Sequence, residues 1–270
     1  MEGDKLIKLI ASDMDGTLLD DSGRIPEEFF DIYESLNSKN IVFAAASGRQ
    51  YYTLARDFAS IKENVIFIAE NGTFVVHENK ELYSCFLDTA VVQEIISIGR
   101  ELEDVYIVLC GKKSAYIEDD NPKLIEQVDK YYERSELVED LMNVKDDILK
   151  VALCDFKGSA NNSNRAFSIY KDKLNVTVSG YLWLDIFSKQ ANKGEALKYI
   201  QSKFNISSKE TMVFGDYFND VEMFQNAHHS YAMLNAPEGV KKYARYIAKS
   251  NSEHGVLHAI KESVLKNCSA

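Results

Sequence analysis

Three short apolar runs alternate with stretches of helical periodicity in the first 70 residues, and this pattern constrains the fold more than any other feature. The runs span residues 6–11, 41–46 and 65–69. Between the first two, Pro26 opens a stretch in which Phe29, Tyr33 and Leu36 recur at helical spacing. The order strand, helix, strand, helix, strand predicts a parallel sheet with right-handed crossovers.

Two aspartates follow the first apolar run, in the sequence Asp13-Met14-Asp15-Gly16-Thr17. In open α/β sheets, ligands bind at the carboxyl ends of the strands, so both carboxylates stand where chemistry is usually placed. One carboxylate can attack, the other can move a proton, and both can help to hold a hard cation. The alternative is a turn that uses Asp and Gly for their turn propensity.

The pattern changes near Leu82 and returns near Gly194. Between these points strands come in pairs between helices, which predicts an α+β unit with an antiparallel sheet. A helix is expected at residues 164–174 and strand at residues 176–186. Earlier, Asn71-Gly72 between two apolar runs predicts a hairpin. We expect one domain formed by residues 1–84 and 188–270, with a second domain inserted at residues 85–187.

Composition excludes several classes of partner. The net charge of -11 and the pI of about 5.0 disfavour nucleic acid and anionic membranes. No apolar run approaches the roughly 18 residues of a membrane span, and residues 1–5 carry acids where a signal peptide carries bases. The 4 cysteines form no C-x-x-C pair, which favours reduced thiols. We expect a cytoplasmic protein, a monomer or weak homodimer, without nucleic-acid or membrane partners.

Three more polar stretches lie at the expected ends of core elements: Ser47-Gly48-Arg49, Lys193-Gly194, and Gly215-Asp216 with Asn219-Asp220. With the first motif, their order and spacing resemble the haloacid dehalogenase superfamily, and most closely its Cof-type branch of small-molecule phosphatases. The resemblance covers nearly the whole chain, including Glu70-Asn71-Gly72 and Gly255-Val256. It implies an α/β fold with a Rossmann-like parallel-sheet core and a mobile α/β (α+β) cap inserted after the third strand.

The resemblance implies a role for each acidic residue. Asp13 would be the nucleophile, and Asp15 the general acid and base. Asp216 would complete a Mg²⁺ site with Asp13 and the backbone carbonyl of Asp15. Asp220 would support Lys193 or the metal shell. Four carboxylates against the ion and one lysine leave a negative surplus next to a phosphate, which favours a proton on one carboxyl, and the role of Asp15 requires one.

The remaining motif residues would bind the phosphate group. The resemblance implies this role for Ser47, Lys193 and Asn219. Gly48 allows backbone N–H groups to approach the phosphate, and the helix after Arg49 points its positive end there, so Arg49 has a supporting place. A carboxylate nucleophile is already ionised at pH 7, and a magnesium ion with Lys193 would remove its repulsion from the phosphate dianion.

Each of these residues also has a purely structural interpretation. Ser47 could cap a helix, Lys193 could be a solvated surface lysine, and Asp220 could cap the helix that begins at Val221. One departure from the family concerns Tyr217-Phe218, because a small residue is usual at the first position. The bulky pair could narrow the site or pack against the cap.

The function that we expect is a Mg²⁺-dependent phosphatase acting on a small phosphorylated metabolite, such as a sugar phosphate, through an aspartyl-phosphate. A phosphomutase would use the same intermediate and return the group to a sugar. A phospho-accepting regulatory domain also gathers aspartates at strand ends, but it needs neither an inserted cap nor Asp15. A dinucleotide-binding fold is disfavoured, because no G-x-G-x-x-G follows the first strand.

Overall fold

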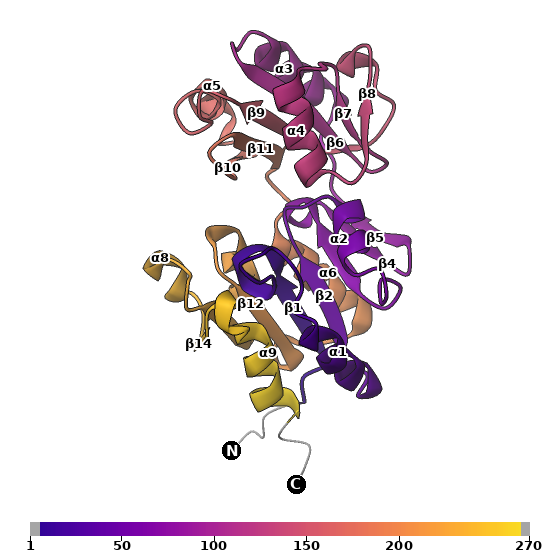
Figure 1. Cartoon of the computed structure of the whole chain (residues 1–270), viewed down its shortest axis with the longest axis vertical. Helices are drawn as coiled ribbons and strands as arrows, with labels where there is room; N and C mark the ends of the chain where they lie inside the picture. Colours follow the sequence, from indigo (N-terminus) through magenta and orange to yellow (C-terminus); the bar gives the residue numbers. More distant parts are fainter. Residues whose placement is uncertain (1–5, 266–270) are drawn as a thin grey trace. The chain divides into compact units, whose positions relative to one another are not determined.

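The computed structural model describes residues 6–265, and the chain divides into two compact units, each with its own sheet (Figure 1). Within the described range, the first unit comprises residues 6–48, 57–83 and 192–265. The second unit comprises residues 49–56 and 84–191. The fold class predicted from the sequence, an α/β parallel-sheet core with an inserted α+β domain, is confirmed.

The first unit has an eight-stranded sheet in the order β14-β13-β12-β1-β2-β3-β4-β5. The five pairings from the edge strand β14 to β3 are parallel, and β3 pairs with β4 in the antiparallel sense across the predicted Asn71-Gly72 turn. The strands are β1 (Leu9–Asp13), β2 (Val42–Ala46), β3 (Ile66–Ala69), β4 (Phe74–His77), β5 (Lys80–Ser84), β12 (Thr211–Gly215), β13 (His229–Met233) and β14 (Tyr246–Ala248).

Helices cover both faces of this sheet, which explains why β1, β3 and β12 are buried along their whole length. On one face, Leu9 of β1 packs in one cluster with Leu197 and Ile200 of α6. On the other, Phe43 of β2 meets Phe29 of α1 with ring centroids 5.0 Å apart. The helices of the unit are α1 (Glu28–Ser38), α6 (Lys193–Phe204), α7 (Val221–Gln225), α8 (Glu238–Lys241) and α9 (Gly255–Ile260).

The second unit has a six-stranded sheet in the order β10-β11-β9-β6-β7-β8, antiparallel except between β7 and β8. Ile95 of α3 packs on one face and Leu124 of α4 on the other. The elements are α2 (Tyr51–Asp57, mostly within this unit), α3 (Thr89–Arg100), β6 (Val105–Gly111), β7 (Ala115–Ile117), α4 (Pro122–Tyr131), β8 (Ser135–Leu137), β9 (Ile148–Asp155), α5 (Ser163–Ala166), β10 (Leu174–Val178) and β11 (Trp183–Ser188).

Some sequence-based elements differ in the structure. The helix expected at residues 164–174 is wrong in extent, because α5 ends at Ala166 and a 3₁₀ turn follows at Phe167–Tyr170. Leu174 instead pairs with Ser188 of β11. The strand expected at residues 176–186 is two strands, β10 and β11, with a turn between them. Strands β5 and β8 were not expected from the sequence. Strand β8 is wholly exposed and lacks an apolar pattern that would have predicted it.

Three further expectations concern the last helix, the cysteines and membrane-spanning segments. The last helix, expected from Gly255 to Lys266, is α9 with a π-helical turn that reaches Leu265, and Lys266 lies outside the described residues. Cys85, Cys110 and Cys154 are free thiols, while Cys268 and residues 1–5 also lie outside the described range. In residues 6–265, no helix is long and apolar enough to span a membrane.

Candidate active site

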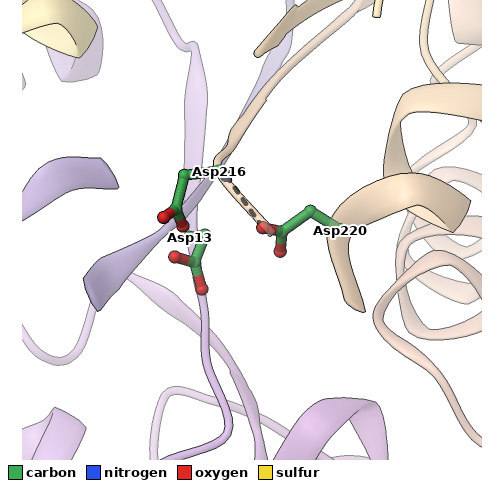
Figure 2. A group of neighbouring side chains, drawn as sticks. All are labelled: Asp13, Asp216 and Asp220. Atoms are coloured by element: carbon green, nitrogen blue, oxygen red, sulfur yellow. Dashed lines mark hydrogen bonds between the residues drawn. The ribbon is translucent and has the colours of Figure 1, made fainter. Parts of the chain in front are cut away.

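Asp13 and Asp216 lie side by side because their strands are neighbours. Asp13 is the last residue of β1, Asp216 follows β12 directly, and the two strands are paired in parallel, so their carboxyl ends share one edge of the sheet. Together with Asp220, these residues bring carboxylate oxygens within 4.8 Å of one another (Figure 2). The structure therefore gathers three carboxylates from two separate sequence motifs.

Lys193 supplies the positive charge of this cluster. It is the first residue of α6, whose start is fixed by Asn192, because the Asn192 side chain accepts a hydrogen bond from the Glu195 N–H at 2.8 Å. The Lys193 Nζ donates to Asp13 Oδ1 and, at 2.7 Å, to Asp220 Oδ1. The side chain is 1% exposed, so the surface-lysine interpretation is wrong.

Asp220 holds both the lysine and the loop after β12. Its Oδ2 accepts hydrogen bonds from the N–H groups of Asp216 and Tyr217, each at 3.0 Å, while its Oδ1 accepts from Lys193. Asp220 occupies the N-cap position of α7, as one interpretation predicted, but its side chain makes no capping hydrogen bond there. A Cβ at Gly215 would lie 2.4 Å from the Asp220 Cβ, so glycine is needed for this close approach.

The turn after β1 holds Asp216 in place. The Thr17 hydroxyl donates to Asp216 Oδ1 at 3.2 Å. Gly16 has φ +77°, and a Cβ there would lie 2.5 Å from Asp216 Oδ2, so this position requires glycine for both reasons. Asp15 has an exposed side chain outside the group of three carboxylates, and its roles as acid and as a backbone ligand stay predictions.

Ser47 follows β2, the other neighbour of β1, and therefore lies at the same edge of the sheet. Its N–H donates to the Ile68 carbonyl at 2.8 Å, and its carbonyl accepts from the Asn71 N–H at 2.9 Å. Helix α2 begins only at Tyr51, so Ser47 is not its N-cap. The Asn219 amide donates to Asn71 Oδ1 at 3.2 Å, which connects the loop after β12 to the turn after β3.

Two further predictions concern Arg49 and the pair Tyr217-Phe218. Arg49 belongs to the second unit, so its supporting role at the site stays a prediction. Tyr217 and Phe218 form an edge-to-face pair with centroids 5.5 Å apart, and they are 54% and 53% exposed. More than half of the surface of each residue therefore faces solvent.

Burial and mutual repulsion dominate the electrostatics of the cluster. Burial, followed by the charge of Asp220, raises the pKa of Asp13 well above its usual range, although Lys193 opposes this. The same two causes raise the pKa of Asp216 to about 6. Burial alone would lower the pKa of Lys193, but Asp13 and Asp220 outweigh it and raise that pKa.

A divalent cation fits this donor set. Three carboxylates face one ammonium group, and a cation would relieve the excess negative charge. The donors are oxygens only, which suits a hard ion such as Mg²⁺. Since both oxygens of Asp220 already accept hydrogen bonds from the protein, Asp13 and Asp216 are the side chains best placed to hold it.

Comparison with known protein families, sequences and structures supports the family that the sequence motifs indicate. Residues 10–260 match the model of the haloacid dehalogenase-like hydrolase family. The 5-amino-6-(5-phospho-D-ribitylamino)uracil phosphatase YbjI of Escherichia coli is 35% identical over 266 residues, which cover 97% of each chain. The structure of SMU.1108c from Streptococcus mutans has a TM-score of 0.86 at 32% identity, covering 96% of this chain and 99% of that one. That of TM0651 from Thermotoga maritima has a TM-score of 0.86 at 26% identity, with 95% and 97% covered.

The chain belongs to the haloacid dehalogenase-like hydrolase family, as the sequence motifs indicated. It is an enzyme of the phosphatase type found among its relatives. The family match spans both the β1 motif and the β12 motif, and therefore the whole carboxylate cluster.

The raised pKa of Asp216 predicts a pH-dependent effect of its replacement. The folded state binds the proton of the Asp216 carboxyl group more tightly than the unfolded chain does. The contribution of this proton to the free energy of unfolding is therefore complete below about pH 4 and is lost as the pH rises through about 6. Without divalent cations, Asp216→Asn should therefore melt at a higher temperature than wild type at pH 7 and at the same temperature at pH 4. Differential scanning fluorimetry measures this difference.

Two controls accompany this prediction. Mg²⁺ should raise the melting temperature of the wild type at pH 7 but not that of Asp216→Asn. Asp20→Asn should act with the opposite sign, because a hydrogen bond from Ser22 lowers the pKa of Asp20. Equal melting temperatures of wild type and Asp216→Asn at pH 7 would contradict the prediction.

Proposed function

We propose that this enzyme is a Mg²⁺-dependent phosphatase that hydrolyses a small phosphorylated metabolite, such as a sugar phosphate, through an aspartyl-phosphate on Asp13. The observation that carries this proposal is the buried array in which Lys193 contacts both Asp13 and Asp220 beside Asp216. A carboxylate at the end of a central strand, paired with an ammonium group, is suited to attack a phosphoryl group whose negative charge must be offset.

In the proposed reaction, Asp13 is the nucleophile and Asp15 is the general acid and base. An oxygen of Asp13 attacks phosphorus, and the bond between phosphorus and the ester oxygen breaks. Asp15 gives its proton to the leaving alkoxide, then takes a proton from the water that attacks the aspartyl-phosphate. The exposed side chain of Asp15 is compatible with this exchange, because solvent can reach it.

The charged groups around Asp13 have complementary tasks. Lys193 would neutralise charge on the transferring phosphoryl group, and Asp220 would keep the ammonium group in place. The side chains of Asp13 and Asp216, with the backbone carbonyl of Asp15, would hold the magnesium ion. When bound, this ion supplies positive charge that reduces repulsion between the carboxylate and the phosphate.

The phosphate oxygens would be bound by Ser47, Gly48 and Asn219. Ser47 and Asn219 are both connected to Asn71, by backbone and side-chain hydrogen bonds respectively. This shared partner supports a common binding role, because it keeps two polar groups from different motifs in one place. Arg49 would support this loop from the start of the following segment.

The second unit would act as the cap and select the substrate, with domain boundaries near residues 85 and 187. The relative from Escherichia coli is named for 5-amino-6-(5-phospho-D-ribitylamino)uracil, so this compound belongs in a substrate panel with sugar phosphates, flavin mononucleotide and pyridoxal phosphate. Phosphate release from this panel tests the proposed function. We further propose a cytoplasmic protein, a monomer or weak homodimer, without nucleic-acid or membrane partners.

Hydrolysis should require a divalent cation, with magnesium best. The reason is that the oxygen-only ligands suit a hard ion that keeps several of its waters. Phosphate release should stop in excess chelator and return when magnesium is added above the chelator concentration. Zinc or calcium could bind the same oxygens and inhibit through a different geometry. Full activity in excess chelator would exclude a metal-dependent reaction.

Asp13→Asn should abolish turnover, because an amide cannot form the aspartyl-phosphate although it keeps the shape of the side chain. Circular dichroism and orthophosphate binding should remain close to wild type, which separates loss of chemistry from loss of fold. A variant that retained a large fraction of the wild-type rate would disprove the nucleophile assignment.

Asp15→Asn should affect poor leaving groups most. A sugar alkoxide needs a proton as its bond breaks, whereas an acidic nitrophenol leaves readily without one. General acid help is typically worth about 10²–10⁴-fold. The variant should therefore lose aspartyl-phosphate formation by that order with sugar phosphates, and by much less with nitrophenyl phosphate.

The measurement for Asp15 is the pre-steady-state burst of released sugar or nitrophenol. Steady-state rates would hide the difference, because hydrolysis of the intermediate also needs Asp15 as a base. Equal burst losses with both substrates would mean that Asp15 acts through the metal or the structure and not as the acid.

A further inference from the structure

The segment that follows the proposed phosphate-binding loop belongs to the other unit. Ser47 and Gly48 are part of the first unit, whereas residues 49–56, which contain nearly all of α2, are part of the second. The chain returns to the first unit at Asp57 and enters the second again at Ser84. Residues 49–56 thus form a short segment of the second unit that is far in sequence from the rest of that unit.

Side-chain hydrogen bonds hold α2 to the end of α4. The Gln50 amide donates from Nε2 to the Arg134 carbonyl at 2.9 Å, and its Oε1 accepts from the Arg134 N–H at 3.0 Å. The Thr53 hydroxyl donates to the Tyr131 carbonyl at 3.2 Å and accepts from the Glu133 N–H at 3.3 Å. Two side chains thus satisfy four backbone groups of residues 131–134.

The Tyr131 carbonyl lies in the last turn of α4, so the Thr53 hydroxyl replaces an intrahelical partner that this group loses where the helix ends, whereas Glu133 and Arg134 follow the helix. Gln50 directly precedes α2 and Thr53 lies in its first turn, so both side chains lie at the start of this helix. They are 3% and 4% exposed, so water does not readily substitute for either side chain. Two more contacts add to the attachment, since the Tyr52 hydroxyl donates to the Lys112 carbonyl at 3.1 Å and the Arg134 guanidinium lies 3.7 Å from the Tyr52 ring centroid.

The preceding residues are held just as firmly by the first unit. Both backbone groups of Ser47 are bonded there, to the Ile68 carbonyl and the Asn71 N–H. A Cβ at Gly48 would lie 3.0 Å from Asn71 Oδ1, so Gly48 also fits closely against this turn. Only Gly48 and Arg49 separate the bonds of Ser47 to one unit from the bonds of Gln50 to the other.

We propose that Gln50 and Thr53 are positioning residues that couple the second unit to the phosphate-binding loop Ser47-Gly48. The inference rests on the proposed function, which assigns phosphate binding to this loop. Because α2 is bonded to residues 131–134, a displacement of the second unit carries Gln50 with it and acts on Gly48 through the backbone. The occupancy of the phosphate site and the state of the second unit then depend on each other.

The test compares isosteric and conservative variants at one position. Thr53→Val removes the hydroxyl at nearly constant volume, Thr53→Ser keeps it, and Gln50→Ala removes both amide bonds to Arg134. With magnesium present, the inhibition constant of orthophosphate should rise about tenfold in Thr53→Val and Gln50→Ala, the size expected for one or two buried hydrogen bonds. Thr53→Ser should stay within about twofold of wild type on the same scale.

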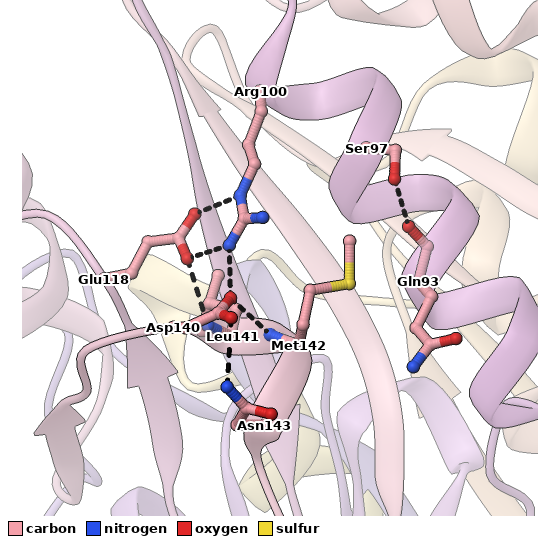
Figure 3. Close-up of polar contacts among 8 residues, drawn as sticks. All are labelled: Gln93, Ser97, Arg100, Glu118, Asp140, Leu141, Met142 and Asn143. Atoms are coloured by element: carbon pink, nitrogen blue, oxygen red, sulfur yellow. Dashed lines mark hydrogen bonds and ion pairs between the residues drawn. The ribbon is translucent and has the colours of Figure 1, made fainter.

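Arg100→Ala is the control for general weakening of the second unit. Arg100 donates to Glu118 and, at 2.7 Å, to Asp140, and so ties the end of α3 to the loop that carries Asp140 (Figure 3). These contacts lie in the second unit but involve no residue of α2. The variant should lower the melting temperature without changing the inhibition constant of orthophosphate.

A second measurement follows the coupling directly. In wild type and Thr53→Ser, saturating orthophosphate should slow hydrogen exchange at the N–H groups of Glu133 and Arg134, and this effect should vanish in Gln50→Ala. The proposal is overturned if Thr53→Val and Gln50→Ala only lose thermal stability, as Arg100→Ala does, with unchanged orthophosphate inhibition. If the wild type hydrolyses no phosphoester, the proposed function fails, and the exchange response to orthophosphate alone decides on the coupling.

Discussion

The contact on which the rest of the site depends is that of the Lys193 ammonium group with Asp13 and Asp220. A buried ion is costly unless it is paired and its remaining bonding capacity is used. Here the second oxygen of Asp220 is used as well, by the N–H groups of Asp216 and Tyr217. The same ion pair that makes the lysine tolerable inside the protein therefore also sets the position of the loop that carries Asp216.

The sheet makes this arrangement possible by placing distant segments at one edge. Strands β2, β1 and β12 are consecutive in the sheet and parallel, so Ser47, Asp13 and Asp216 all follow strands that end on the same side. Close packing of the loops then depends on the absence of a side chain at Gly16 and Gly215. The geometry of the carboxylate cluster is a consequence of strand order, and local loop chemistry only refines it.

The sequence predicted the parts that depend on local pattern, and it missed those that depend on distant partners. Apolar runs identified β1, β2 and β3, and four motifs in order identified the family. The exposed strand β8 has no apolar pattern, and the helix expected at residues 164–174 gives way to β10 because Leu174 finds a partner on β11. The hydrogen bonds between Gln50 and Arg134 join residues 84 positions apart, and no local sequence pattern in either segment predicts them.

The division between the two units also separates two physical requirements. Charge stabilisation needs groups that do not move during the reaction, and the cluster around Lys193 meets this need because each of its polar groups is bonded within the core. Substrate selection needs a surface that can open and close, which a unit joined through several separate crossings of the chain can provide. Two of these crossings lie beside residues proposed to act on the phosphate, because one follows Ser47-Gly48 and another, between Ala191 and Asn192, precedes Lys193. Movement of the second unit would therefore reach the proposed phosphate site along the backbone from both of these segments.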